Sequence, residues 1–360
     1  MKRSILFLIA LASFAIASCT KDEVKEVNRG LAIDFRTVLT RATETTVNNL
    51  GGFHVTAITE SETPYFSDLQ FTKNGDYYSS STKYYWPSDN SPINFYAYAP
   101  SKEDLGVSET GATLTVTKET QTLTSFAPAA DITAQKDFIV AMATGTKEDA
   151  DEGVGLVFDH VLSQVAVVAY NSNPAYIVKV KGVRIGKVYT KADFTFQGKS
   201  WTNHAVKGNY DVTYDEARTL GNKKAEPMNL MKSEGDNAML IPQTLIAWDA
   251  PTEPTNEGEG TYFSFLVNIT TVAGAHVYPS DDSYMWLATP VDGEWNPGFK
   301  YVYVVDVTTG GYVDPETPVD PDDPDPDDPF VPGTSLDGGE LKFSASIYSW
   351  DNYYPSDIEM

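Results

Sequence analysis

The strongest constraint on the fold is a succession of short segments in which apolar and polar residues alternate. A period of two places the apolar side chains on one face of a β-strand, and the segments are rich in Tyr, Val, Ile, Thr and Phe, which strands favour. Clusters of Gly, Pro, Asn, Asp and Ser separate them, and no long helical period occurs. The clearest segments are residues 53–59, 93–99, 112–118, 138–144, 156–170, 177–188, 239–244, 262–272, 284–290 and 301–308. The sequence therefore predicts an all-β protein.

Chain length and one acidic stretch indicate two domains. About 340 residues follow the N-terminal signal described below, enough for two domains of ordinary size. The acidic, glycine-containing stretch 147–153 interrupts the strand pattern. We therefore predict two β-sandwich domains in tandem, residues 42–155 and residues 156–312.

A further strand is predicted ahead of the first domain, in residues 31–39. Its large apolar side chains fall on one face, whereas Ala, Asp, Arg and Val occupy the other, so one side of the strand should be buried. The apolar face consists of Leu31, Ile33, Phe35 and Leu39. We assign this strand to a leader that covers residues 19–41.

The first 18 residues are typical of a cleavable signal peptide. Lys2 and Arg3 precede an apolar run, residues 5–16, which is too short to span a ~30 Å hydrocarbon core as a permanent helix. Small residues then lead to Cys19, and this ending resembles the lipobox of bacterial lipoproteins, in which the cysteine is lipidated. Because Cys19 is the only cysteine, the chain has no partner for an internal disulfide. The alternative is an ordinary signal peptide that contains a buried cysteine.

The charge balance excludes two classes of partner. The chain has 50 acidic and 26 basic residues, a net charge of −24. Nucleic acids and anionic membrane surfaces both require basic patches, so neither is expected to bind. The lipid on Cys19 would instead supply attachment to the outer membrane.

Residues 313–333 differ in kind from the rest of the chain. They contain eight acids, seven prolines and no basic residue, which predicts an extended spacer with a reach of ~60 Å at ~3.1 Å per residue. One more strand is predicted after the spacer, within the segment 334–360. Its apolar face consists of Leu341, Phe343, Ala345 and Ile347. This strand could pair within its own second domain or with a neighbouring molecule.

No motif points to catalysis, a cofactor or a metal. The four histidines lie far apart in the sequence, and residues 149–153 lack the ligand spacing of a calcium loop. No Gly-x-Ser-x-Gly motif occurs, and no pair of carboxylates is singled out for glycoside hydrolysis. The aromatic run 84–86 could stack on sugars, although such a run more often alternates between the faces of a strand. We expect a non-enzymatic protein.

Several short stretches together resemble a known family. The stretches lie in the same order along the chain: residues 40–43 with 53–57, 85–87 with 93–100, 135–141, 158–163, 240–244 and 295–303. Behind a lipobox, they make the chain resemble the fimbrillins, the type V pilin family of Bacteroidales, and in particular their Mfa-like branch.

This resemblance implies a pilus subunit built from two transthyretin-like β-sandwich domains. In the family, an arginine-specific protease removes the leader with its strand at the cell surface, and the opened groove accepts a strand from the next subunit. Arg41 lies just behind the predicted leader strand, so a cut there would remove strand and lipid together. The protein would then pass from the outer membrane into a fimbrium.

Two alternatives remain open at this stage. Arg41 could be a solvent-facing arginine at the start of a domain. The whole protein could also be a lipid-anchored adhesin or glycan-binding lipoprotein that does not polymerise. In either case the expected partners are other fimbrial subunits or a ligand on a host or bacterial surface.

Overall fold

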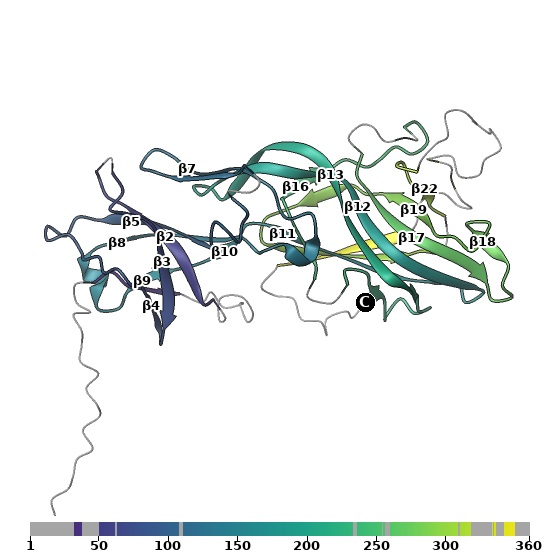
Figure 1. Ribbon diagram of the computed structural model, residues 1–360, viewed down its shortest axis with the longest axis horizontal. Helices are drawn as coiled ribbons and strands as arrows, with labels where there is room; N and C mark the ends of the chain where they lie inside the picture. The colour runs from purple at the N-terminus through teal and green to yellow at the C-terminus, as the bar shows by residue number, and fades with distance from the viewer. Residues whose placement is uncertain are drawn as a thin grey trace, which may run out of the picture.

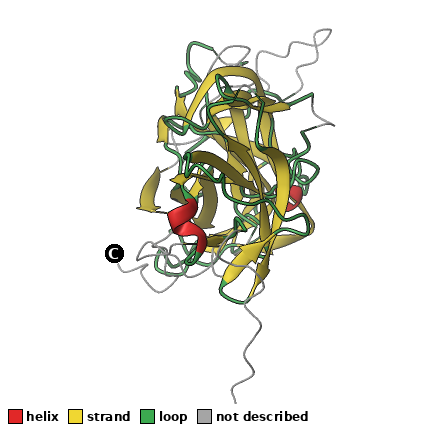
Figure 2. Ribbon diagram, turned by 90° about the vertical axis from the view of Figure 1, so that its left-hand side faces the viewer, coloured by secondary structure: helices red, strands yellow, loops and turns green. Residues whose placement is uncertain are grey.

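The computed structural model describes residues 32–37, 50–61, 63–107, 111–232, 236–253, 255, 260–308, 310–317, 333, 335 and 342–349. Strands form almost all of its regular structure (Figure 2), which confirms the all-β prediction. Two short 3₁₀ helices, η1 (Ile132–Ala134) and η2 (Lys147–Ala150), are the only helices in the described part. Across those same residues, no helix has the length and apolarity needed to cross a membrane.

An eight-stranded sheet occupies the N-terminal end of an elongated molecule, at the left of Figure 1. Its strands lie in the order β10-β8-β5-β2-β3-β4-β1-β9. In chain order they are β1 (Phe35–Thr37), β2 (Gly52–Ile58), β3 (Phe66–Asn74), β4 (Tyr77–Ser79), β5 (Ile93–Ala99), β8 (Ile139–Gly145), β9 (Val154–Leu156) and β10 (Asp159–His160).

The other end is a sandwich of two sheets. One has the order β22-β19-β17-β12-β7-β6, with β13 beside β12 and β18 beside β17. Its strands are β6 (Thr113–Val116), β7 (Gln121–Phe126), β12 (Tyr176–Thr195), β13 (Ser200–Thr219), β17 (Tyr262–Thr271), β18 (His276–Tyr278), β19 (Met285–Pro290) and β22 (Tyr312–Val313).

The facing sheet has the order β14-β11-β21-β23, with β15 beside β11. Its strands are β11 (Ser163–Tyr170), β14 (Met228–Asn229), β15 (Ala238–Leu240), β21 (Phe299–Asp306) and β23 (Lys342–Ser349). A separate pair is formed by β16 (Gln243–Leu245) and β20 (Gly293–Trp295). The two large sheets share one apolar core, in which the rings of Phe263 and Tyr303 meet at 4.7 Å.

Aromatic side chains fill the region where the two ends of the molecule meet. The ring of Phe194 on β12 lies 5.3 Å from that of Phe138, just before β8, and 5.1 Å from that of Trp201 on β13. Strands β6 and β7 precede residue 155 but belong to the sheet of β12, since β7 pairs with β12 and β6 pairs with β7. The two-domain division at residue 155 therefore stays a prediction.

The predicted spacer begins later than the sequence suggested. Val313 and Asp314 are fully buried, and Val313 belongs to β22, which pairs with β19. Residues 313–317 thus form part of the folded protein, because Val313 is buried and Asp314 forms a buried ion pair with Arg184. Residues 318–332 lie outside the described part.

Candidate functional site: the groove around the leader strand

The leader strand lies inside the N-terminal sheet. β1 runs antiparallel to β4, where Phe35 is opposite Tyr78, and parallel to β9, where Phe35 is opposite Val154. Just before it, the Ile33 amide donates to the Tyr84 carbonyl over 2.9 Å. β1 is therefore an inner strand, with backbone partners on both sides, and β4 and β9 form the walls of a groove that it fills.

The centre of the groove is the side chain of Phe35. It is fully buried, and its ring meets the rings of Phe71, Phe95 and Phe53 edge-on at centroid distances of 4.7, 5.0 and 6.0 Å. Ile33 is also buried in the same apolar core. Each such side chain contributes roughly 1.5–3 kcal/mol by burial, and edge-to-face ring pairs add to this.

One glycine lets β9 approach the leader. Gly153 has a φ of +73°, and a Cβ atom there would lie 3.2 Å from the Asp34 carbonyl oxygen. That oxygen accepts a hydrogen bond from the Val154 amide over 3.0 Å. A side chain at Gly153 would therefore strain the turn and crowd the bond that joins β9 to the leader.

Charged contacts at the rim of the groove are weak. Asp34 lies 3.6 Å from the Lys83 ammonium group, and Arg36 lies 3.3 Å from Glu152 with both side chains exposed. An exposed ion pair such as that of Arg36 and Glu152 contributes roughly 0–1 kcal/mol. The leader is thus held mainly by apolar burial and backbone hydrogen bonds.

Leu50, the first described residue after the leader strand, lies close to β4, the neighbour of that strand. The Tyr78 hydroxyl donates to the Leu50 carbonyl over 2.8 Å, and Tyr78 lies opposite Phe35. Burial raises the pKa of Tyr78, so its hydroxyl stays protonated as a donor. Residues 38–49, which include Arg41, therefore connect two points at the same end of the groove.

Of the predicted leader face, the described part contains Ile33 and Phe35, and both lie in the groove. Ala32, assigned to the opposite face, is also buried, because it forms a bridge to Tyr85. The remaining predicted residues of this region fall outside the described residues: Cys19, Leu31, Leu39 and Arg41.

The terminal strand lies on the chain's own second sheet. β23 pairs antiparallel with β21, so that Ala345 is opposite Tyr303 and Ile347 is opposite Tyr301. β23 is the edge strand of that sheet, and 60% of Ile347 is exposed. Leu341 and the side chain of Phe343 lie outside the described part. The terminal strand is therefore much less buried here than the leader strand.

The walls of the groove were not predicted from the sequence. Neither β4 nor β9 was expected as a partner of the leader, and the aromatic lining comes from three other strands. Two signals were available: glycine in the acidic stretch 147–153, and Phe53 and Phe95 in predicted strands. Neither signal by itself identifies the partner of a strand far away in sequence.

The histidines have structural contacts. His160 Nδ1 lies 2.6 Å from an Asp137 oxygen, and His54 Nδ1 lies 3.2 Å from Asp68. His204 Nε2 lies 2.7 Å from the Pro242 carbonyl oxygen. Among the residues that the structure describes, no three His, Cys, Asp or Glu side chains converge on a point where a metal ion could bind.

Comparison with known proteins places the chain in a family. The sequence profile described as fimbrillin-like matches residues 40–321. The fimbrium subunit Fim1C of Phocaeicola vulgatus is 27% identical over 254 residues, which are 60% of this chain and 66% of that protein. The match thus spans just under two thirds of the relative's length.

Two solved structures share the fold. A fimbrial protein from Bacteroides vulgatus ATCC 8482 superposes with a TM-score of 0.59 at 16% identity, covering 89% of this chain and 99% of the other. A candidate cell adhesion protein from Bacteroides uniformis ATCC 8492 gives a TM-score of 0.50 at 13% identity, with the same coverage. Because the family profile covers more than half of the sequence, this chain belongs to the fimbrillin-like family.

Proposed function

We propose that this protein is a structural subunit of a cell-surface fimbrium that assembles by exchange of the leader strand for a strand of a neighbouring subunit. It would be exported as a lipoprotein on Cys19 and released by a cut after Arg41. Membership in the fimbrillin-like family supports the fimbrial role. The observation that carries the exchange mechanism is the position of β1, an inner strand with a fully buried Phe35 that lies close to the N-terminus.

Loss of β1 would leave a strong acceptor for another strand. The facing edges of β4 and β9 would lose their backbone partners, and unpaired strand edges readily bind a further strand. The ring-lined pocket of Phe35 would be empty, and loss of a buried Phe side chain costs about 3–5 kcal/mol. A replacement strand with alternating apolar residues would restore both contributions.

The terminal strand is the candidate donor. In its position beside β21 it leaves 60% of Ile347 exposed, whereas Phe35 in the groove is fully buried. Its alternating apolar residues would therefore gain burial in a groove such as that of β1. The sequence between β22 and β23 supplies the length that a move to another molecule requires.

A disulfide experiment tests this assignment. Gly155 lies opposite Arg36 on the outward side of the groove, so a donor residue in the place of Arg36 should be close enough for a disulfide. We would pair Gly155→Cys with Lys342→Cys, Ser344→Cys or Ser346→Cys, each in a Cys19→Ser background. Folded protein would be oxidised before and after treatment with an arginine-specific protease.

The expected result is a ladder of disulfide-linked subunits with one of the three pairs, and only after cleavage. The Gly155→Cys variant alone provides the control for collision between exposed thiols. A cleaved protein that stays monomeric with all three pairs would contradict strand exchange. It would favour the second candidate, a lipid-anchored surface adhesin whose terminal strand stays on β21, as the pairing of Tyr303 with Ala345 allows.

A further inference from the structure

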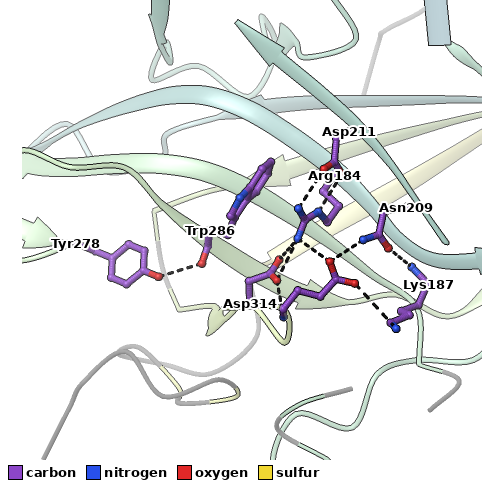
Figure 3. A network of polar contacts seen from close by, with 8 residues as sticks. Arg184, Lys187, Asn209, Asp211, Tyr278, Trp286 and Asp314 are labelled. Atoms are coloured by element: carbon purple, nitrogen blue, oxygen red, sulfur yellow. Dashed lines mark hydrogen bonds and ion pairs between the residues drawn. The ribbon is translucent and has the colours of Figure 1, made fainter. Parts of the chain in front are cut away.

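The chain crosses the outer surface of the larger sandwich sheet immediately before the acidic spacer. Val313 pairs with Leu287 of β19, and the next residues pass over β17 to β12. Arg184 projects from β12 on the side opposite the main core, because its neighbours Val183 and Ile185 belong to that core. Figure 3 shows Asp314 reaching Arg184 across the sheet.

Arg184 is the centre of the polar network in Figure 3. Its guanidinium group donates two hydrogen bonds to the carboxylate of Asp211 on β13, at 2.9 and 3.0 Å. Its third nitrogen, Nη1, lies 3.3 Å from Asp314. The group also lies over the Trp286 ring, 4.5 Å from the centroid. A planar guanidinium can make all these contacts at once, which an ammonium group cannot.

Asp314 is fastened by both its side chain and its backbone. The side chain is fully buried against Arg184, and the amide donates to the Trp286 carbonyl over 3.4 Å. Its carboxylate accepts a hydrogen bond from the Glu316 amide over 2.8 Å, and its carbonyl accepts one from the Thr317 amide over 3.0 Å. The chain is thereby folded into a tight turn on the sheet.

Glu316 adds a second point of attachment. Its carboxylate accepts a hydrogen bond from the Asn209 amide group over 2.8 Å and lies 3.3 Å from Arg184. Lys187 is 4.0 Å away on the other side. The ion pair between Arg184 and Asp211 connects β12 to β13. Asp314 and Glu316 in addition attach the start of the C-terminal arm to these two strands.

The far end of the spacer returns to the same place. The Gly333 amide donates to the Val313 carbonyl over 2.9 Å, and Ser335 forms a bridge to Tyr312. The contacts described at Gly333 and Ser335 are backbone interactions, whereas Asp314 forms an ion pair with its side chain fully buried. The two ends of the spacer are therefore held very differently.

We propose that the Arg184 cluster, defined as Arg184, Lys187, Asn209, Asp211, Asp314 and Glu316, is a fixed root for the C-terminal arm. Residues 313–317 stay on the sheet when β23 leaves β21, and the arm becomes free only from residue 318. The residues between 318 and the start of β23 at Lys342 then set its reach, to which the 16 spacer residues 318–333 alone contribute roughly 50 Å at ~3.1 Å per residue. In an assembled fibre, tension on the donated strand would pass through this root into β12 and β13. That consequence rests on the proposed function, whereas the fixed root itself does not.

Hydrogen exchange on the intact, uncleaved chain tests the root directly. The amides of Asp314, Glu316 and Thr317 report on it, and those of β17 report on global folding. Deletion of residues 334–360 should leave exchange at residues 313–317 within twofold of the intact chain. Arg184→Met should accelerate it at least tenfold while β17 stays protected. Arg184→Lys, which keeps the charge but loses the planar group, serves as the milder variant if Arg184→Met does not fold, and should also accelerate exchange.

Arg218→Met is a matched control. Arg218 lies on the neighbouring β13, its guanidinium group is 3.8 Å from the Tyr214 ring centroid, and it donates to backbone carbonyls at 3.2 and 3.3 Å. None of these partners belongs to the C-terminal arm, so exchange at residues 313–317 should not change. Fast exchange at these residues after deletion of residues 334–360 would overturn the proposal, because the terminal strand would then be the anchor. So would unchanged exchange in both Arg184 variants.

The same measurement on cleaved, assembled protein separates the two proposals. Polymers in which residues 313–317 remain protected from hydrogen exchange would agree with both the fixed root and strand exchange. Polymers in which that protection is lost would overturn the fixed root but leave strand exchange standing. Failure to polymerise would count against strand exchange, whereas the root would still be decided by the monomer data.

Discussion

The ring of Phe35 stands edge-on to the ring of Phe71, with centroids 4.7 Å apart and planes at 86°. The two residues belong to strands that are not neighbours in the sheet, since β4 lies between β1 and β3. Phe71 lies on β3, 36 residues after Phe35 in the sequence, and its ring packs directly against the leader side chain. The contact connects the leader strand to the core of the N-terminal sheet.

Phe35→Ala should lower the free energy of unfolding of the uncleaved chain by about 3–5 kcal/mol, because a fully buried ring is lost from a packed core. Urea unfolding would measure this. Arg36→Ala, on the exposed side of the same strand, should cost less than about 1 kcal/mol. Equal effects of the two substitutions would show that the ring does not hold the leader.

Gly153→Ala should loosen the leader and speed its removal by an arginine-specific protease. The reason is twofold: a positive φ, which costs about 1–2 kcal/mol with a side chain, and the close approach of the Cβ to the Asp34 carbonyl. Gly75→Ala is the matched control, since its φ is +65° but open space surrounds it. Gly75→Ala should lower the free energy of unfolding by the cost of the positive φ alone and should not speed cleavage of the leader. Equal cleavage rates in both variants would argue against a role for Gly153 at the groove.

Arg41→Gln should leave the leader attached and prevent assembly, because the proposed cut after Arg41 would be lost and the groove would stay filled. Mass spectrometry of surface material should find an N-terminus at Ala42 in the wild type and not in the variant. Arg36→Gln is the control, since cleavage there would divide the strand. An acylated Cys19 on all assembled wild-type protein would refute release by cleavage at Arg41.

Ile347→Ala should cost less than about 1 kcal/mol in the uncleaved monomer, because most of the side chain is already exposed. In assembled protein the same change should weaken subunit contacts, since the proposed donation would bury this face of the strand. Monomer stability by urea unfolding and polymer dissociation by dilution would be compared. Val305→Ala, a change in the fully buried core, should do the opposite: it should lower the free energy of unfolding of the monomer more than it weakens the subunit contacts. A monomer that loses several kcal/mol with Ile347→Ala would indicate that β23 is anchored to β21.

Asp68→Asn should change the pH dependence of stability. Burial raises the pKa of Asp68, but hydrogen bonds from His54, Tyr98 and Lys102 outweigh it and lower the pKa to about 2. A lowered carboxyl pKa stabilises the fold above pH 3.8, and this contribution is lost as the pH falls towards 2. The hydrogen bond to Asp68 raises the pKa of His54 above 6.5, so its contribution is fully present below pH 6.5 and is lost as the pH rises through the raised pKa.

The stability difference between wild type and Asp68→Asn should therefore be largest near pH 5 and should shrink on both sides. Thermal unfolding between pH 2 and pH 9 would measure it. Asp76→Asn, in the exposed turn between β3 and β4, should give a difference that does not follow this curve. A difference for Asp68→Asn that persists unchanged at pH 2 would exclude the carboxylate as its source.

Where one face of a strand is buried and the pairing is regular, the sequence was a good guide. The segment 93–99 corresponds to β5 (Ile93–Ala99), and the expected inward direction of Ile33 and Phe35 agrees with their burial. Period-two alternation follows from local backbone geometry, so it needs no knowledge of the partner strand.

The strands that escaped prediction are those whose alternation is broken. Phe66 and Phe71 of β3 are five residues apart, yet both are buried, because Asp68 adopts a φ of +51° and the register shifts there. β13 is 20 residues long but buries few side chains, and Asn203 and Val206 interrupt it with positive φ. Bulges of this kind change which face a residue occupies, and a simple period cannot reveal them.

Segment 156–170, predicted as one strand, is divided between the last residue of β9, β10 and β11. β9 pairs with the leader, β10 pairs with β8, and β11 joins the second sandwich sheet. Most residues of the segment are buried, and each break coincides with a change of partner strand. Segment 239–244 is likewise divided between β15 and β16, where Pro242 has no amide to donate.

The sequence by itself determined the β-rich class, the apolar face of the leader and the acidic character of the spacer, since each is a local pattern of side chains. The tertiary structure decided that β1 lies between β4 and β9, and that Arg184 holds Asp314 at the root of the C-terminal arm. These pairs are separated by tens to more than a hundred residues. Their formation depends on how whole sheets pack and align, and no local pattern encodes which distant partner gives the best burial.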